Sequence, residues 1–123
     1  MATKYLGRSA ILGIRPKIET IDDIPNWEGA IYIRELTAAD VLAVTSLRDK
    51  DVDAMIISAT YMICSICDEN GKAIFLPEDA DALVEQIGYN AMNHIVNRIL
   101  KLSDLLEDDD DDDNEDESGN EPD

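Results

Sequence analysis

Two cysteines three positions apart, Cys64 and Cys67, are the residues of this chain whose spacing is most typical of redox or metal chemistry. A structural zinc site needs four ligands, and the chain adds only one histidine, His94, to these two thiols. A redox pair needs a lowered thiol pKa at the start of a helix, whereas this pair ends an apolar helix beside Asp68 and Glu69, whose charges raise a thiol pKa. We therefore expect two reduced core cysteines, no metal and no cofactor.

Other patterns that could do chemistry are also incomplete. His94 lies among apolar residues with no Ser or Cys nucleophile close in the sequence, so a surface histidine or a hydrogen-bonded one is expected rather than a general base. The acidic run 108–113 lacks the glycine and the spaced ligands of a calcium loop. Gly71 and Lys72 stand without the second glycine or the Ser/Thr of a phosphate loop. The sequence predicts no catalytic residue, and hence a protein that is not an enzyme.

Charge divides the chain into two parts. Of its 123 residues, 107–123 contain 12 acidic and no basic side chains, while 1–106 contain 16 acidic and 10 basic ones. A segment with so much like charge and so little apolar surface cannot collapse. We expect one globular domain over residues 1–106, which begins with an irregular or partly helical arm at residues 1–14, and a disordered acidic tail over 107–123.

The formal net charge of −18 also narrows the classes of partner. Binding to phosphate needs Lys and Arg, so the negative charge of this chain opposes binding to nucleic acid, and anionic membrane surfaces repel the chain as well. The longest apolar-rich run, Met55–Cys67, is too short to span a bilayer. The first residues lack the apolar core of a signal peptide. We expect no nucleic-acid partner, no membrane contact and a location in the cytoplasm.

The first half of the chain predicts a β-hairpin followed by a helix. Residues 17–21 alternate apolar and polar side chains, and residues 30–36 are rich in β-branched and aromatic ones, so both segments are expected to be strands. Residues 22–26 contain the Asp, Pro and Asn of a turn between them. Thr37 opens a capping-box pattern, which predicts a helix to about Leu47.

The second half predicts three more helices. Residues 52–67 are apolar nearly all round, which is typical of a central helix packed on several sides. Residues 68–71 form a strong turn signal with Asn-Gly at its end. A third helix follows Pro77 and stops at Gly88, and a fourth covers about residues 89–106. The predicted class is α+β, with a small N-terminal hairpin packed on about four helices.

The fourth helix carries more apolar side chains than one helix face needs. They form two adjacent stripes: Met92, Val96 and Leu100 in one, and Ile95, Ile99, Leu102 and Leu106 in the other. Either both stripes belong to the core, or one of them contacts a partner helix or the same helix of another subunit. Trp27 is either an exposed residue that anchors a binding patch or a residue that caps the hairpin. The candidate partner-contacting residues are therefore Met92, Val96, Leu100, Trp27 and Tyr89.

Two segments resemble a known family. The pattern Pro-x-Trp-x-Gly at 25–29, followed by Ile-Tyr-Ile-Arg-Glu-Leu-Thr at 31–37, resembles the P-E-W-G and V-x-V-R-E-L-(T/S) motifs of siphovirus tail assembly chaperones. Residues 68–83 are similar to that family's D-E-x-G-x-x-(L/I)-F and D-(V/A)-x-x-L motifs, and Leu100–Leu102 to its closing L-x-L. The matching motif residues are Pro25, Trp27, Gly29, Arg34, Glu35, Asp68, Gly71, Phe75 and Asp79. The resemblance covers about residues 9–106; Asn26, Glu28 and the acidic tail depart from it.

The resemblance implies a role in building the phage tail. Members of this family bind the tape measure protein, act in the host cell cytoplasm as late proteins of virion morphogenesis, and are absent from the mature virion. Many also exist in a longer form, made by ribosomal frameshifting, which recruits the tail tube protein; this chain would be the short form. The acidic tail would keep a coated client soluble, and a homo-oligomer is compatible with the sequence.

Two other functions remain open at the level of the sequence. An acidic decoy would mimic nucleic acid and occupy the basic cleft of a host or phage protein, which the charge of −18 suggests. Such mimics usually display their carboxylates on a folded surface, whereas most of this excess lies in residues 107–123. A small helical subunit of an unrelated complex is the third alternative.

Overall fold

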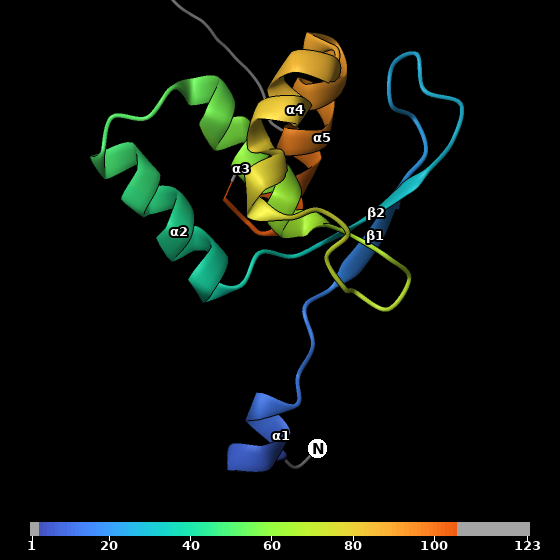
Figure 1. Ribbon diagram of the computed structural model, residues 1–123. Helices are drawn as coiled ribbons and strands as arrows, with labels where there is room; N and C mark the ends of the chain where they lie inside the picture. Colours follow the sequence, from blue (N-terminus) through green and yellow to red (C-terminus); the bar gives the residue numbers. More distant parts are fainter. Residues whose placement is uncertain (1–2, 106–123) are drawn as a thin grey trace, which may run out of the picture.

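The two strands of the N-terminal hairpin form where the alternating pattern predicts them. The computed structural model describes residues 3–105 (Figure 1). Strand β1 (Ile18–Ile21) pairs antiparallel with β2 (Ile31–Arg34), and Ile21 lies opposite Ile31. Ile21 and Ile33 are fully buried, so this face of the hairpin forms part of the core. Both strands are shorter than expected, and the α+β class with an N-terminal hairpin is confirmed.

A third strand replaces the expected last turn of the second helix. Helix α3 (Ala54–Ser65) ends earlier than predicted, and β3 (Ile66–Cys67) then pairs antiparallel with β2, giving the sheet order β1-β2-β3. The fully buried Ser65 causes this change. Its Oγ accepts a hydrogen bond from the backbone N–H of Arg34 at 3.2 Å and donates one to the carbonyl of Arg34 at 2.7 Å. This exchange satisfies both backbone groups and brings the following residues against the edge of β2.

The turn after β3 has the geometry that its residues predict. One carboxylate oxygen of Asp68 accepts backbone N–H bonds from Asn70 at 2.8 Å and from Lys72 at 3.0 Å. These two bonds, the one from Lys72 first, lower the pKa of Asp68. Gly71 has φ +83°, and a Cβ there would lie 3.2 Å from Cδ1 of Ile18. Both the backbone angle and the close approach of β1 therefore favour glycine.

Helix α2 (Ala38–Asp49) begins at the predicted capping box and runs two residues beyond Leu47. Thr37 Oγ1 accepts from the Asp40 N–H at 3.2 Å, and Asp40 Oδ2 accepts from the Thr37 N–H at 2.9 Å. At its other end, Arg48 donates to the hydroxyl of Tyr61 at 3.0 Å, which ties α2 to α3.

The remaining helices cover α3. A short 3₁₀ segment η1 (Pro77–Asp79) leads into α4 (Ala80–Gln86), and α5 (Tyr89–Leu102) ends four residues before the predicted limit. Ser103 caps α5, and its Oγ accepts from the backbone N–H of Leu36 at 2.9 Å, so the end of this helix is tied to the link between β2 and α2. Helix α3 contacts α2, α4 and α5, as expected of a central helix (Figure 1).

The core lies between the sheet, α3 and α5. Its largest fully buried side chains are Ile21, Ile33, Met62, Ile95, Ile99, Val44 and Ser65. Within residues 3–105, no helix has the length and apolar character needed to cross a bilayer. The expected disordered tail, 107–123, falls outside the described residues, as does Leu106 of the second stripe.

The N-terminal arm extends away from this body. Residues 3–17 contain one short helix, α1 (Arg8–Leu12), which has no buried residue. Figure 1 shows the arm leaving the sheet at the start of β1 and standing clear of the helices. The arm is therefore partly helical, as expected, and it contributes nothing to the core.

Candidate partner-binding surface

The two cysteines are free thiols with little reactivity. Burial is the main cause that raises the pKa of Cys64, to about 11, and the neighbouring Asp40 adds to it. Burial also raises the pKa of Cys67. No group of three or more His, Cys, Asp or Glu side chains suited to a metal ion occurs within residues 3–105. The pair therefore lacks the lowered pKa of a redox centre.

This pKa predicts slow alkylation of Cys64. At pH 8 a thiol with a pKa of about 11 is ionised to roughly one part in a thousand, and only the thiolate reacts. In a Cys67→Ser variant, iodoacetamide should modify Cys64 slowly, with a rate that rises as the pH approaches the pKa. Mass spectrometry measures the rate, and the same variant in denaturant supplies the fast reference. Rapid modification of the folded protein at pH 8 would contradict the burial seen here.

His94 is hydrogen-bonded, as expected. Its Nε2 lies 3.0 Å from Oδ1 of Asp23, and this hydrogen bond is the main cause that lowers the pKa of Asp23. Arg98 donates to the same carboxylate at 3.3 Å and to Glu19 at 3.2 Å. These contacts join α5 to β1 and the loop that follows it. The group therefore holds two elements of the fold together.

An apolar hollow lies between α2 and α3. We call it the α2–α3 hollow; it has a volume of about 370 Å³ and is lined by Ala43, Leu47, Ile56, Thr60, Ile63, Cys64, Pro77 and Ala80. Leu42 precedes the lining residue Ala43 in the sequence and is 70% exposed. Leu76 precedes the lining residue Pro77 and is 57% exposed. An apolar hollow of this kind can receive the apolar face of a partner helix.

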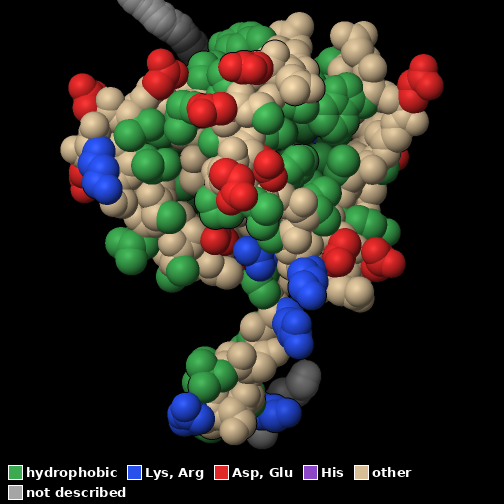
Figure 2. Space-filling view, in the orientation of Figure 1, with side chains coloured by type: hydrophobic (Ala, Val, Ile, Leu, Met, Phe, Trp, Pro, Cys, Tyr) green, Lys and Arg blue, Asp and Glu red, His purple; other side chains and the backbone are tan. Residues whose placement is uncertain are grey.

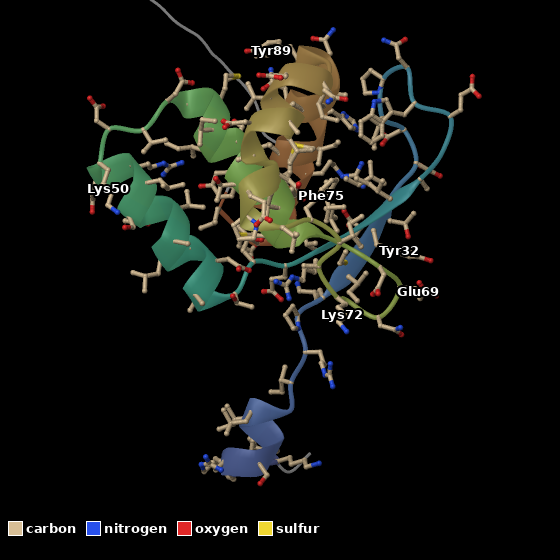
Figure 3. All side chains as sticks on the ribbon, in the orientation of Figure 1. Tyr32, Lys50, Glu69, Lys72, Phe75 and Tyr89 are labelled. Atoms are coloured by element: carbon tan, nitrogen blue, oxygen red, sulfur yellow. The ribbon has the colours of Figure 1, made fainter. Side chains whose placement is uncertain are left out.

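A second hollow lies on the other side of α4. This α4 hollow has a volume of about 440 Å³ and is lined by Ile74, Phe75, Asp79, Ala82, Leu83, Gln86 and Ile87. In Figure 3, Phe75 lies beside α4, below the end of the molecule that carries Tyr89. Figure 2 shows acidic side chains over this face of the body, with hydrophobic side chains among them.

A third hollow joins two of the predicted candidates, Trp27 and Tyr89. They line it together with Pro25, Asn26, Gly88, Asn90 and Ala91, and its volume is about 520 Å³. Trp27 is half-buried and packs against the core, whereas Tyr89 is 63% exposed. The hairpin loop and the start of α5 thus bring together residues that are 62 positions apart in the sequence.

The other three candidates lie elsewhere. Met92 is 3% exposed and Val96 is 8% exposed, and both belong to the core; Leu100 is half-buried and packs against it. The expectation that Met92 and Val96 contact a partner therefore does not fit the folded chain. The physical reason is that α5 packs against both α3 and strand β2, so more than one of its faces is covered. Among the described residues, the members of both stripes are either buried or packed against the core.

Comparisons with known proteins agree with this fold. No protein-family model matches the sequence, and no curated protein matches it. Among solved structures, "Structure of bacteriophage HK97 tail assembly chaperone" matches with a TM-score of 0.56 and 18% sequence identity, over 71% of this chain and 85% of that one. The chain has the fold of a phage tail assembly chaperone. At this identity the similarity establishes the fold alone.

Several motif residues hold the tail assembly chaperone fold together. Arg34 donates through Nε to the carbonyl of Cys64 at 2.9 Å and lies 3.7 Å from Asp40, so it links β2 to α3 and α2. Glu35 accepts from the backbone N–H of Lys17 at 3.2 Å. Asp79 accepts from the N–H of Leu76 at 2.8 Å and thereby opens η1. These three motif residues make structural contacts, the kind of role that the resemblance implies for them.

Proposed function

We propose that this chain is a tail assembly chaperone of a long-tailed bacteriophage, which binds and solubilises the tape measure protein during tail building and is absent from the finished virion. The observation that supports this most strongly is the fold shared with the HK97 tail assembly chaperone over 71% of the chain, together with the family-like motifs at 25–37 and 68–83. This function needs no catalytic residue and no cofactor. It takes place in the host cell cytoplasm.

The α2–α3 hollow is the site we assign to the client. A tape measure protein is a long helical chain whose apolar stripes aggregate when they stay uncovered. The lining residues of this hollow are mostly apolar, and its only polar side chains are those of Thr60 and Cys64. Because Cys64 is a neutral thiol at physiological pH, the hollow presents no charge to an apolar helix. Many copies, each with modest affinity, would coat the client and leave one by one as the tube forms.

Three further features would support the chaperone: its acidic tail, a longer form of the chain and self-association. The acidic residues 107–123 would add about twelve negative charges per bound copy, so that coated clients repel one another. A longer form made by ribosomal frameshifting would recruit the tail tube protein. Self-association of the chaperone would place neighbouring copies along the client.

Co-expression with the tape measure protein of the same phage tests the proposal. We expect the tape measure protein to move from the insoluble to the soluble fraction and to co-purify with this chain. A chain truncated after residue 106 should still bind the client, because the hollow lies within the described body. If neither solubility nor co-purification changes, the proposed function is wrong. Loss of all binding on truncation would instead favour the acidic decoy.

A further inference from the structure

The N-terminal arm, residues 3–17, is basic, whereas the chain as a whole is acidic. The arm contains no acidic side chain and four basic ones: Lys4, Arg8, Arg15 and Lys17. All four are exposed, and none of them forms an ion pair within residues 3–105. Figure 2 shows Lys and Arg side chains along the arm and at its base, and Asp and Glu over the body. The arm therefore presents positive charge that the described body leaves unmatched.

A small hollow at the base of the arm brings two arginines together. We call it the Arg15–Arg34 hollow; it has a volume of about 80 Å³ and is lined by Arg15, Pro16, Ile18, Arg34, Asn70 and Gly71. Among the described residues, no acidic side chain belongs to this lining. Guanidinium groups bind carboxylates through paired N–H donors, so the hollow is suited to an acidic side chain.

The end of α5 lies close to the base of the arm. Ser103 Oγ accepts from the backbone N–H of Leu36 at 2.9 Å, and the neighbouring Glu35 donates its backbone N–H to the carbonyl of Lys17 at 2.8 Å. Beyond the described part the chain continues for 18 residues, which span at most about 60 Å when extended. The 15 residues of the arm span at most about 50 Å. The C-terminal residues can therefore reach every basic side chain of the arm.

We propose that the acidic segment 107–123 binds the basic arm of its own chain, with a carboxylate in the Arg15–Arg34 hollow. Charge complementarity supports this occupant, because the segment contains 12 acidic side chains and no basic one. The shared body holds the two segments at an effective concentration of the order of millimolar, so a weak contact is sufficient. The acidic side chains outnumber the four basic ones of the arm, so each copy remains strongly negative, as the proposed function requires.

The contact would mask the arm from other proteins. The arm also exposes apolar side chains, with Leu12 at 68% and Ile14 at 64%, and its helix α1 has no buried residue. Uncovered apolar side chains on such a segment favour contacts with other molecules. A basic partner that captures residues 107–123 would release the arm, and so would high salt. This inference concerns a contact within one chain and goes beyond the proposed function.

Nuclear magnetic resonance of two full-length chains tests the contact. One is the parent, and the other is a variant in which Asp108 to Asp113 are replaced by Asn; we call it the Asn variant. At low salt the backbone amide signals of residues 4–17 should differ between the two chains. The differences should vanish at about 1 M salt, where the Debye length is only about 3 Å. They should not depend on protein concentration, because both segments belong to one molecule.

Two charge reversals in the Asn variant locate the contact. A synthetic peptide of residues 107–123, added to the Asn variant, should shift the same arm signals and so give a dissociation constant. Arg15→Glu alters the Arg15–Arg34 hollow and should raise this constant about fivefold or more. Lys50→Glu is the matched control: it makes the same charge change on an exposed side chain at the end of α2, away from the arm (Figure 3). It should change the constant by less than about twofold.

The inference is wrong if the arm signals of the parent and of the Asn variant coincide at low salt. Differences that grow with protein concentration would assign the contact to another copy and would also overturn it. Equal weakening by Arg15→Glu and Lys50→Glu would indicate a general attraction between charges, without a contact at the hollow. None of these results bears on tape measure binding, so the proposed function is tested independently.

Discussion

The Ala43→Glu variant is expected to fold like the parent chain and to lose the tape measure protein. Ala43 is an exposed residue of α2 and lines the α2–α3 hollow, so the glutamate side chain would enter the space assigned to the client. Burying a charge against an apolar helix without a partner costs about 2 kcal/mol or more, which is roughly a thirtyfold loss of affinity. Co-purification from cells that express both proteins measures the effect.

Thr45→Glu is the control for this experiment. It adds the same charge to the same helix. Residues two positions apart in a helix lie about 200° apart around its axis, so position 45 faces away from the hollow that position 43 lines. Thr45 is exposed and does not line the α2–α3 hollow. We expect Thr45→Glu to bind the client as the parent does. Equal binding by both variants would place the client elsewhere, and the hollow formed by Trp27 and Tyr89 would be the next surface to test.

The sequence predicted those parts of the fold that depend on neighbouring residues. The Thr37 and Asp40 capping box and the glycine turn at Gly71 use side chains within four positions of the backbone groups they satisfy. Strand β3 is different, because Ile66 and Cys67 continue an apolar helix pattern. They become a strand because Ser65 bonds to Arg34, which is 31 positions away. No local pattern contains that contact.

The candidate site was harder to predict than the fold, and burial explains why. A run of apolar side chains indicates that a helix is covered, but the number of neighbours that cover it depends on the tertiary packing. Thus Met92 and Val96 lie in the core, whereas Leu42 on α2 and Leu76 before η1 are among the exposed leucines. The exposure of Leu12 is a feature that the sequence can predict, because apolar residues in an arm outside any packed element have no core to join.

Met92→Ala is expected to destabilise the fold rather than to act on a partner directly. Met92 is 3% exposed and belongs to the core between α5 and its neighbours. Replacing a buried methionine by alanine removes its apolar contacts and leaves a cavity, which costs about 2–5 kcal/mol of unfolding free energy. For a domain of about 100 residues this lowers Tm by roughly 10 °C or more. Urea titration and thermal melting, followed by circular dichroism, measure both quantities.

Asn97→Ala is the control on the same helix. Asn97 is exposed, and five helical positions place it about 140° from Met92. Its replacement should change the unfolding free energy by no more than about 0.5 kcal/mol, as is usual for surface substitutions. At a temperature where the Met92→Ala variant remains folded, this variant should still bind the client, because the side chain of Met92 does not reach the surface. If Met92→Ala kept the stability of the parent and lost the client, the α5 stripe would contact a partner after all, through a rearrangement that uncovers this helix.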